Sequence, residues 1–237
     1  MMQSRISSFA SRAIAISLLL LTLTATAVAQ NRKSATLASN PDRLAEDSVA
    51  FFRGVAVSAD MVGLIQQAFS SYGQYEAALR INLKDRYFPV FELGYGVADA
   101  DNPTTNLNYK TKAPYWKVGL DFNIAKHKHD AYRIYVGARY AMTYYKFDVW
   151  GTNLNDPVWG EDITYNAKGV KANYHWLESL FSVDAKIAGP LRLGWSVRYR
   201  YRIAHNDGNI GNTWYVPGYG KQGGTRLGGT FNVIFEI

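Results

Sequence analysis

The residues with the clearest chemical potential are basic side chains that recur at alternate positions in the last quarter of the chain. Between residues 191 and 203, Arg192, Arg198, Arg200 and Arg202 alternate with apolar and aromatic residues. This period of two places the arginines on one face of a β-strand, because successive side chains point to opposite sides of the backbone. Something apolar must cover the other face. The arginine face must meet anionic groups.

Histidines are the other chemically versatile residues. His127 and His129 lie in an H-x-H-D turn that could hold a metal, although a solvated turn is the favoured interpretation. His175 and His205 have no serine partner at a defined spacing. Residues 206–209 offer calcium-like oxygens but lack the later bidentate glutamate, so a Gly/Asn-rich turn is favoured. We therefore predict no catalytic residue, metal site or cofactor. A small surface enzyme acting on lipid or envelope substrates is the alternative.

Composition and the N-terminus predict export. Arg5 and Arg12 precede an apolar run, and Ala27-Val28-Ala29 offers a small-residue cleavage site. At about eleven apolar residues the run is shorter than the roughly 20 that span a bilayer. We predict a signal peptide over residues 1–29, whose removal lowers the net charge from +7 to +5. No basic run indicates nucleic-acid binding. The absence of Cys excludes disulfides, thiolate metal sites and a lipoprotein anchor.

The rest of the chain divides into a polar tail, residues 30–52, and one all-β domain, residues 53–237. The domain shows eight segments of alternating hydrophobicity. They are residues 53–62, 74–84, 88–97, 115–124, 131–145, 173–187, 191–203 and 225–237. The sixth segment is irregular, because Trp176 and Leu180 fall on the charged face, and it predicts a bulge. The pattern predicts an antiparallel up-and-down barrel of eight strands.

The barrel could be soluble and apolar inside, like a lipocalin, or transmembrane and apolar outside. Connections alternate long and short, which is typical of extracellular loops and periplasmic turns. Tyrosines gather at the long-loop ends of the apolar face, as in an interfacial girdle. Glycines share the charged face, where long side chains need room. These features favour an outer-membrane β-barrel with a periplasmic tail, and leave the soluble barrel as the alternative.

The charged faces then line the lumen. An eight-stranded barrel has an interior that side chains fill, and buried charges must be paired. We therefore predict a plug of ion pairs, with an anion path as the alternative. The predicted network comprises Glu76, Arg80, Glu92, Asp121, Arg139, Glu178, Asp184, Arg198, Arg200 and Arg202.

Aromatic residues in the long loops are candidates for binding a partner. They are Trp150, Trp159, Trp214, Tyr215 and Tyr219. Exposed aromatic residues often anchor interfaces. The alternative is that the loops fold over the barrel rim and pack on themselves. The expected partners are outer-membrane lipid and another envelope protein, either a larger barrel or a lipoprotein.

Several segments resemble a domain-of-unknown-function family of small Gram-negative outer-membrane β-barrel proteins. They are residues 72–80, 85–89, 173–178, 193–200 and 214–218, within a similarity that covers about 55–237. The resemblance implies the same fold and location, and it implies no catalytic residue. Small barrels of this kind are also associated with accessory subunits of the outer-membrane protein assembly machine.

Overall fold

The computed structural model describes residues 50–102, 106–155, 162–211 and 213–237. The predicted signal peptide, nearly all of the predicted tail, and Trp159 lie outside these residues. Within them, no helix is long and apolar enough to cross a bilayer.

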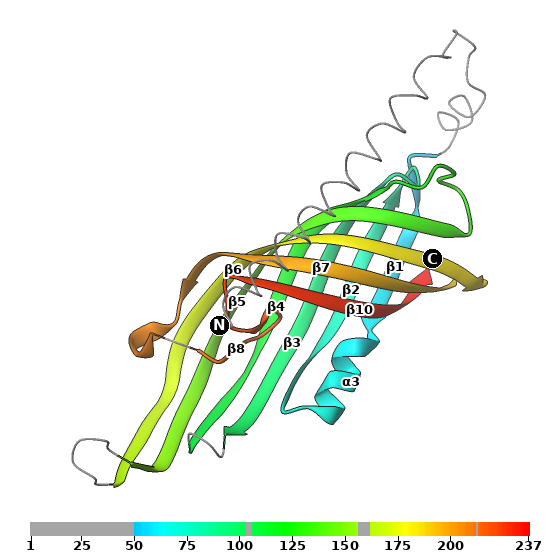
Figure 1. Ribbon diagram of the computed structural model, residues 1–237. Helices are drawn as coiled ribbons and strands as arrows, with labels where there is room; N and C mark the ends of the chain where they lie inside the picture. The colour runs from blue at the N-terminus through cyan, green and yellow to red at the C-terminus, as the bar shows by residue number, and fades with distance from the viewer. Residues whose placement is uncertain (1–49, 103–105, 156–161, 212) are drawn as a thin grey trace, which may run out of the picture. The chain divides into compact units, whose positions relative to one another are not determined.

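Eight antiparallel strands close into a barrel in which each strand pairs with its neighbour in sequence and the last pairs with the first (Figure 1). This confirms the predicted fold. The strands are β1 (Phe52–Asp60), β2 (Tyr72–Leu83), β3 (Tyr87–Asn102), β4 (Leu107–Asn123), β5 (Tyr132–Asn155), β6 (Asp162–Ala188), β7 (Leu191–Asn206) and β10 (Thr225–Glu236). Between β7 and β10 lie the short helix η2 (Gly208–Ile210) and a separate two-stranded sheet of β8 (Tyr215–Val216) and β9 (Gly220–Lys221).

The alternation in β7 decides which face is inside. Trp195 and Val197 are 66% and 54% exposed, whereas Arg198 between Val197 and Tyr199 is only 4% exposed. The same pattern recurs around the barrel, so the outer face is apolar and the lumen is charged. The tyrosines of the predicted girdle are exposed outside: Tyr75, Tyr95, Tyr140, Tyr144, Tyr199 and Tyr201. A soluble barrel would not leave such a belt in water, and a bilayer covers it.

Two hairpins extend well beyond the predicted strands. β5 and β6 have 24 and 27 residues and remain paired as far as Asn155 and Asp162, whereas the corresponding predicted strands cover only residues 131–145 and 173–187. β3 and β4 likewise pair as far as Asn102 and Leu107. A strand needs roughly 9–11 residues to cross the bilayer, so these hairpins project past it. The two strands of each hairpin satisfy each other's backbone hydrogen bonds. Because a strand in water needs no apolar face, these extensions need not alternate in hydrophobicity, and the sequence pattern did not reveal them.

The connection between β1 and β2 is helical rather than irregular. Helix α3 (Met61–Phe69) follows Asp60, whose carboxylate accepts hydrogen bonds from the N–H groups of Val62 at 3.0 Å and Gly63 at 3.2 Å. The first predicted strand therefore ends two residues early. An aspartate at this position caps a helix because it satisfies N–H groups that lack an intrahelical partner.

Helix α3 lies where the barrel wall lacks strand pairing. β1 pairs with β10 only between Ala56–Glu236 and Asp60–Asn232, while β10 continues to Thr225 against β7. The helix contacts both β10 and the start of β2 (Figure 1). At Gly73 a Cβ would lie 2.6 Å from the Cα of Gln67, so only glycine lets the helix pack this closely.

The irregularity predicted in the sixth strand lies in its neighbour. Trp176 and Leu180 point into the lumen, and β6 keeps a regular register with β5 around them. The register shift occurs against β7, between the pairs His175–Ala204 and Trp176–Arg202. The extra residue is therefore in β7. Trp176 is inside because its indole N–H has a carboxylate partner there, 2.8 Å away on Glu178.

Candidate functional site

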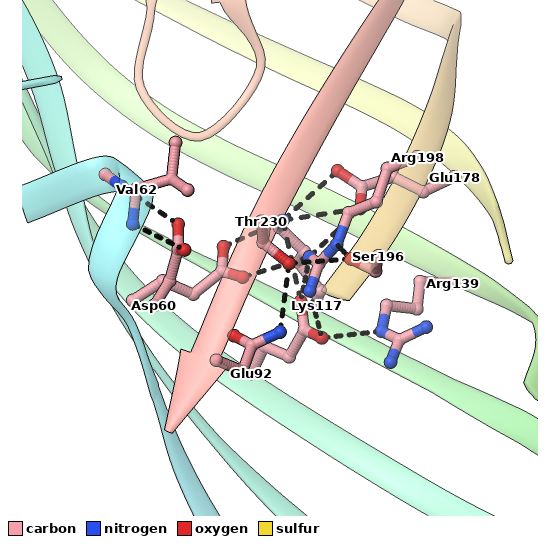
Figure 2. Close-up of polar contacts among 12 residues, drawn as sticks. Asp60, Val62, Glu92, Lys117, Arg139, Glu178, Ser196, Arg198 and Thr230 are labelled. Atoms are coloured by element: carbon pink, nitrogen blue, oxygen red, sulfur yellow. Dashed lines mark hydrogen bonds and ion pairs between the residues drawn. The ribbon is translucent and has the colours of Figure 1, made fainter. Parts of the chain in front are cut away.

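The centre of the lumen is an ammonium group surrounded by three carboxylates. Lys117 Nζ on β4 lies 2.8 Å from Glu76, 3.1 Å from Glu178 and 3.5 Å from Glu92. Its side chain is 0% exposed, and each glutamate comes from a different strand. Figure 2 shows Glu92, Lys117, Glu178 and Arg198 converging from four strands. A charge buried this deeply is tolerated only because opposite charges lie against it.

Arg198 supplies the second cation to the same three acids. Its Nη1 lies 2.9 Å from Glu76, 2.9 Å from Glu92 and 3.5 Å from Glu178. Two cations therefore share three carboxylates. Tyr115 also donates its hydroxyl to Glu76 at 2.8 Å.

Flanking arginines complete the charge balance of this centre. Arg139 binds Asp121 through both terminal nitrogens, at 2.9 and 3.0 Å, and donates from Nε to Glu92 at 2.7 Å. Arg200 donates to Glu178 at 3.0 Å. Bidentate guanidinium–carboxylate pairs combine charge with fixed geometry. Each of the three glutamates therefore has a cationic partner within 3.0 Å.

A second cluster fills the lumen nearer the short turns. Arg192 lies 2.6 Å from Asp184, and Arg80 lies 3.2 Å from Asp184 and 3.3 Å from Asp121. Arg133 continues the chain of pairs to Glu236 at 2.7 Å. The two clusters therefore share Asp121, which links the barrel centre to the half nearer the short turns.

The turn after β2 carries a site that the sequence did not reveal. Asp85 is buried and accepts from Asn82 at 2.6 Å, lies 2.6 Å from His129 Nδ1, and pairs with Arg53 and Arg133 at 3.1 and 3.2 Å. Burial raises the pKa of the Asp85 carboxyl, but the hydrogen bonds from Asn82 and His129 and the two arginines outweigh it and hold the pKa below its ordinary value. Asp85 thus ties two short turns to β1 and β5.

Nine of the ten predicted lumen residues join these clusters. Arg202 does not, because its guanidinium lies over the ring of Tyr174, 5.9 Å from the centroid, and forms no ion pair with any described residue. The register between β6 and β7 shifts next to Arg202. The predicted network omitted Lys117, although its alternation with Trp116 and Val118 placed it on the lumen face. Lys117 lies at the centre of the network because of the relative register of the strands around it, which the sequence pattern of one strand does not contain.

The loop between β7 and β10 folds into the outer end of the barrel. Arg200 donates to the carbonyl of Tyr219 at 2.8 Å, and the Tyr215 hydroxyl donates to the carbonyl of Gly73 at 3.1 Å. Gly218 lies against the ring of Tyr115, where a Cβ would come within 2.4 Å. These contacts hold the β8 segment against the outer end of the charge network.

This insertion corrects two of the predicted partner-binding residues. Tyr215 and Tyr219 are 1% and 0% exposed, so neither ring is presented on the surface. Trp214 lies at the edge, partly exposed and edge-to-face with Tyr72 at 5.7 Å. Loop aromatics prefer the lumen here because their rings bury apolar area while their hydroxyls find carbonyl partners. Their sequence position alone gave no means of choosing between lumen and exterior.

Trp150 lies on the projecting hairpin. It is partly buried and lines a groove of about 300 Å³ with Lys110, Asp148, Tyr165 and Lys168. Trp150 and Trp214 thus remain candidates for partner binding, and Trp159 lies outside the described residues.

The histidines do not form an enzyme-like constellation in the described part of the chain. His175 shares a hydrogen bond with Tyr140 at 2.8 Å on the outer face, and His205 lies 3.6 Å from Asp207. Across residues 50–237, leaving aside the undescribed gaps, no three His, Cys, Asp or Glu side chains gather as a metal site. Residues 206–209 form a turn leading into η2, with the Gly208 N–H bound to the Asn206 side chain.

Comparison with known proteins identifies a family. The family model described as Domain of unknown function (DUF6048) matches residues 11–237. No curated protein matches the chain. Three similar solved structures each have a TM-score of 0.39 to this chain. Neisserial surface protein A is 12% identical, and the match covers 79% of this chain and 98% of that protein; Acinetobacter baumannii CarO2 is 15% identical, with 79% of this chain and 99% of that protein covered. The attachment invasion locus protein Ail of Yersinia pestis is 9% identical, with 78% of this chain and 98% of that protein covered.

Proposed function

This chain belongs to the family described as Domain of unknown function (DUF6048), and we propose that it serves the outer membrane as a sealed structural and interaction barrel. It is an outer-membrane β-barrel protein, with an apolar outer belt that the bilayer covers and a charged interior. The observation that carries the proposal is that the lumen is filled. The Lys117–Arg198 centre occupies the middle and the β8 segment occupies the outer mouth.

A filled lumen predicts no channel activity. Every acid of the centre is within 3.5 Å of a cation, so a permeating ion would have to break several buried pairs. The full-length mature protein should therefore give no stable conductance steps in planar bilayers. A porin from the same preparation serves as the positive control. Reproducible anion-selective steps would contradict the proposal and favour a path along the arginines.

Function should then reside in the surfaces that the barrel displays. The β5–β6 hairpin projects past the bilayer and carries Trp150 and the exposed Tyr165 beside one groove. Tryptophan and tyrosine are favoured anchors at interfaces. We infer that this hairpin binds another envelope protein, a larger barrel or a lipoprotein, and that an accessory role in an outer-membrane assembly complex fits such contacts.

Affinity purification of the protein, with a tag placed after the signal peptide, tests whether it binds an envelope protein. Wild-type protein extracted in mild detergent should retain a stoichiometric envelope protein, and Trp150→Ala should reduce the amount retained. Lys126→Ala, on an exposed turn at the opposite end of the barrel, is the control. Recovery of a lone monomer from both wild type and control would refute the partner.

A further inference from the structure

Three lysines form a row across the outer face of the barrel. Lys112, Lys146 and Lys171 lie on the neighbouring strands β4, β5 and β6, and all three are exposed. Lys146 and Lys171 are direct cross-strand partners. Thr111 pairs with Phe147, and this register sets Lys112 opposite Lys146. Three like charges therefore stand side by side at one level of the sheet, which is an unfavourable arrangement when nothing neutralises it.

At the next level outward in the same sheet, the charges neutralise one another. There Asp99, Lys110 and Asp148 alternate in sign across β3, β4 and β5, and Lys110 lies 2.6 Å from Asp99. The lysine row, one level lower, forms no ion pair with any residue that the structure describes, and its neighbour on β3 is Val97. The chain thus pairs its charges at one level and leaves three cations unpaired at the level below.

The position of the row relative to the membrane identifies the missing anion. Along β5 the outward residues pass from Val136 through the aromatic residues Tyr140 and Tyr144 to Lys146. Aromatic girdles mark the boundary of the hydrocarbon. Lys146 lies two residues, or about 7 Å, beyond Tyr144 toward the long hairpins. That is the level of the lipid headgroups in the outer leaflet.

A groove joins the lysines to the girdle below them. It has a volume of about 500 Å³, and its lining includes the three lysines together with Pro114, Tyr144 and Asn173. Cations thus line the outer part of the groove, while Pro114 and Tyr144 give its lower part an apolar wall. This order matches a lipid that carries an anionic headgroup above an acyl chain.

We propose that Lys112, Lys146 and Lys171 bind the phosphate of a phosphorylated glycolipid, the lipid A that forms the outer leaflet of Gram-negative outer membranes. The ammonium groups bind the phosphate oxygens, and an acyl chain lies over Pro114 and Tyr144. This inference needs only the outer-membrane barrel with its long hairpins outside. It does not depend on the proposed protein partner or on the sealed lumen.

Binding of fluorescent lipid A to the full-length mature protein in detergent tests the site. Each lysine near an anionic lipid surface is worth about fivefold in affinity, so the triple variant Lys112→Gln, Lys146→Gln, Lys171→Gln should bind on the order of 100-fold more weakly. The corresponding triple Lys→Arg variant keeps the charge and should bind as wild type does. Lys126→Gln, which removes an exposed lysine from the turn at the opposite end of the barrel, is the control and should leave affinity unchanged.

Two competitors separate the possible ligands. Unlabelled lipid A should displace the probe, whereas lipid A stripped of its phosphates and inorganic phosphate alone should not. Equal affinity of the wild type and the glutamine variant would overturn the proposal, and so would equal competition by dephosphorylated lipid A. Full displacement by inorganic phosphate would also overturn it, by showing a simple anion site. Heat-modifiable gel migration confirms that each variant is folded before its affinity is compared.

Discussion

The Nζ atom of Lys117 lies 2.8 Å from a carboxylate oxygen of Glu76, and both side chains are buried. The two residues come from β4 and β2, which are not adjacent in the barrel wall. The contact therefore bridges over β3 inside the lumen, where Arg198 of β7 also reaches Glu92 of β3 on the opposite wall at 2.9 Å. It makes the interior a structural element in its own right, because the strands are tied together across the barrel as well as through their hydrogen-bonded edges.

Removing that central cation should strongly destabilise the barrel. Lys117→Met leaves Glu76, Glu92 and Glu178 with too little positive charge, and breaking a buried pair from one side costs about 3–5 kcal/mol. Urea unfolding of the protein refolded in lipid vesicles measures the loss. Lys186→Met, at an exposed lysine near the periplasmic rim, should change little. Adding Glu76→Gln to Lys117→Met should recover part of the loss. An unchanged midpoint in Lys117→Met would show that the centre does not contribute to stability.

A charge on the outer face should reveal the bilayer. Val197→Arg places a cation on an exposed apolar position of β7 between Trp195 and Tyr199. Such a substitution costs about 2–4 kcal/mol at the midplane and less toward the interfaces. Vesicle unfolding should therefore show a large loss for Val197→Arg and almost none for Val197→Leu. Equal stabilities would contradict the assignment of this face to lipid.

The periplasmic Asp85 should make stability depend on acid pH. Its folded pKa is below the ordinary value, so the stabilisation is complete above the unfolded pKa of about 3.9 and is lost as pH falls through the folded pKa. Asp85→Asn should therefore be less stable than wild type at pH 7, and the difference should shrink below about pH 4. Unfolding midpoints at a series of pH values test this. Asp101→Asn, at an exposed carboxyl, should parallel wild type throughout. A constant difference for Asp85→Asn would exclude the ionic origin.

Gly218 should control insertion of the loop into the lumen. Its φ is +80°, and a Cβ would lie 2.4 Å from the Tyr115 ring, so Gly218→Ala should displace the β8 segment. Cleavage by trypsin after Lys221 should then become faster than in wild type. Gly211→Ala is the matched control, because Gly211 has a φ of +73° with open space around it and so carries the same backbone strain without the clash. Similar cleavage of both variants would show that strain, not contact with Tyr115, holds the loop.

The alternation along each strand was enough to predict the barrel and its inside-out polarity. In β7 the arginines and the aromatic residues take opposite faces whatever their partners are, because side chains alternate strictly across a pleated backbone. The number of strands and the long and short connections follow from the same pattern and from the turn residues between them. Nine of the ten predicted lumen residues lie in the charge clusters for the same reason, because parity along a strand decides which side chains point inward.

Only the tertiary structure decided which charges meet and where the chain leaves the pattern. The contacts of Lys117 with Glu76, Glu92 and Glu178 depend on the relative register of four strands, which single-strand periodicity does not contain. Helix α3 forms in a nine-residue stretch with little pattern of its own, where Asp60 caps it and β2 and β10 cover one side. Tyr215 and Tyr219 turn inward because the lumen mouth offers carbonyl partners and an apolar wall. Such contacts join residues far apart in sequence, so they exist only once the barrel has closed.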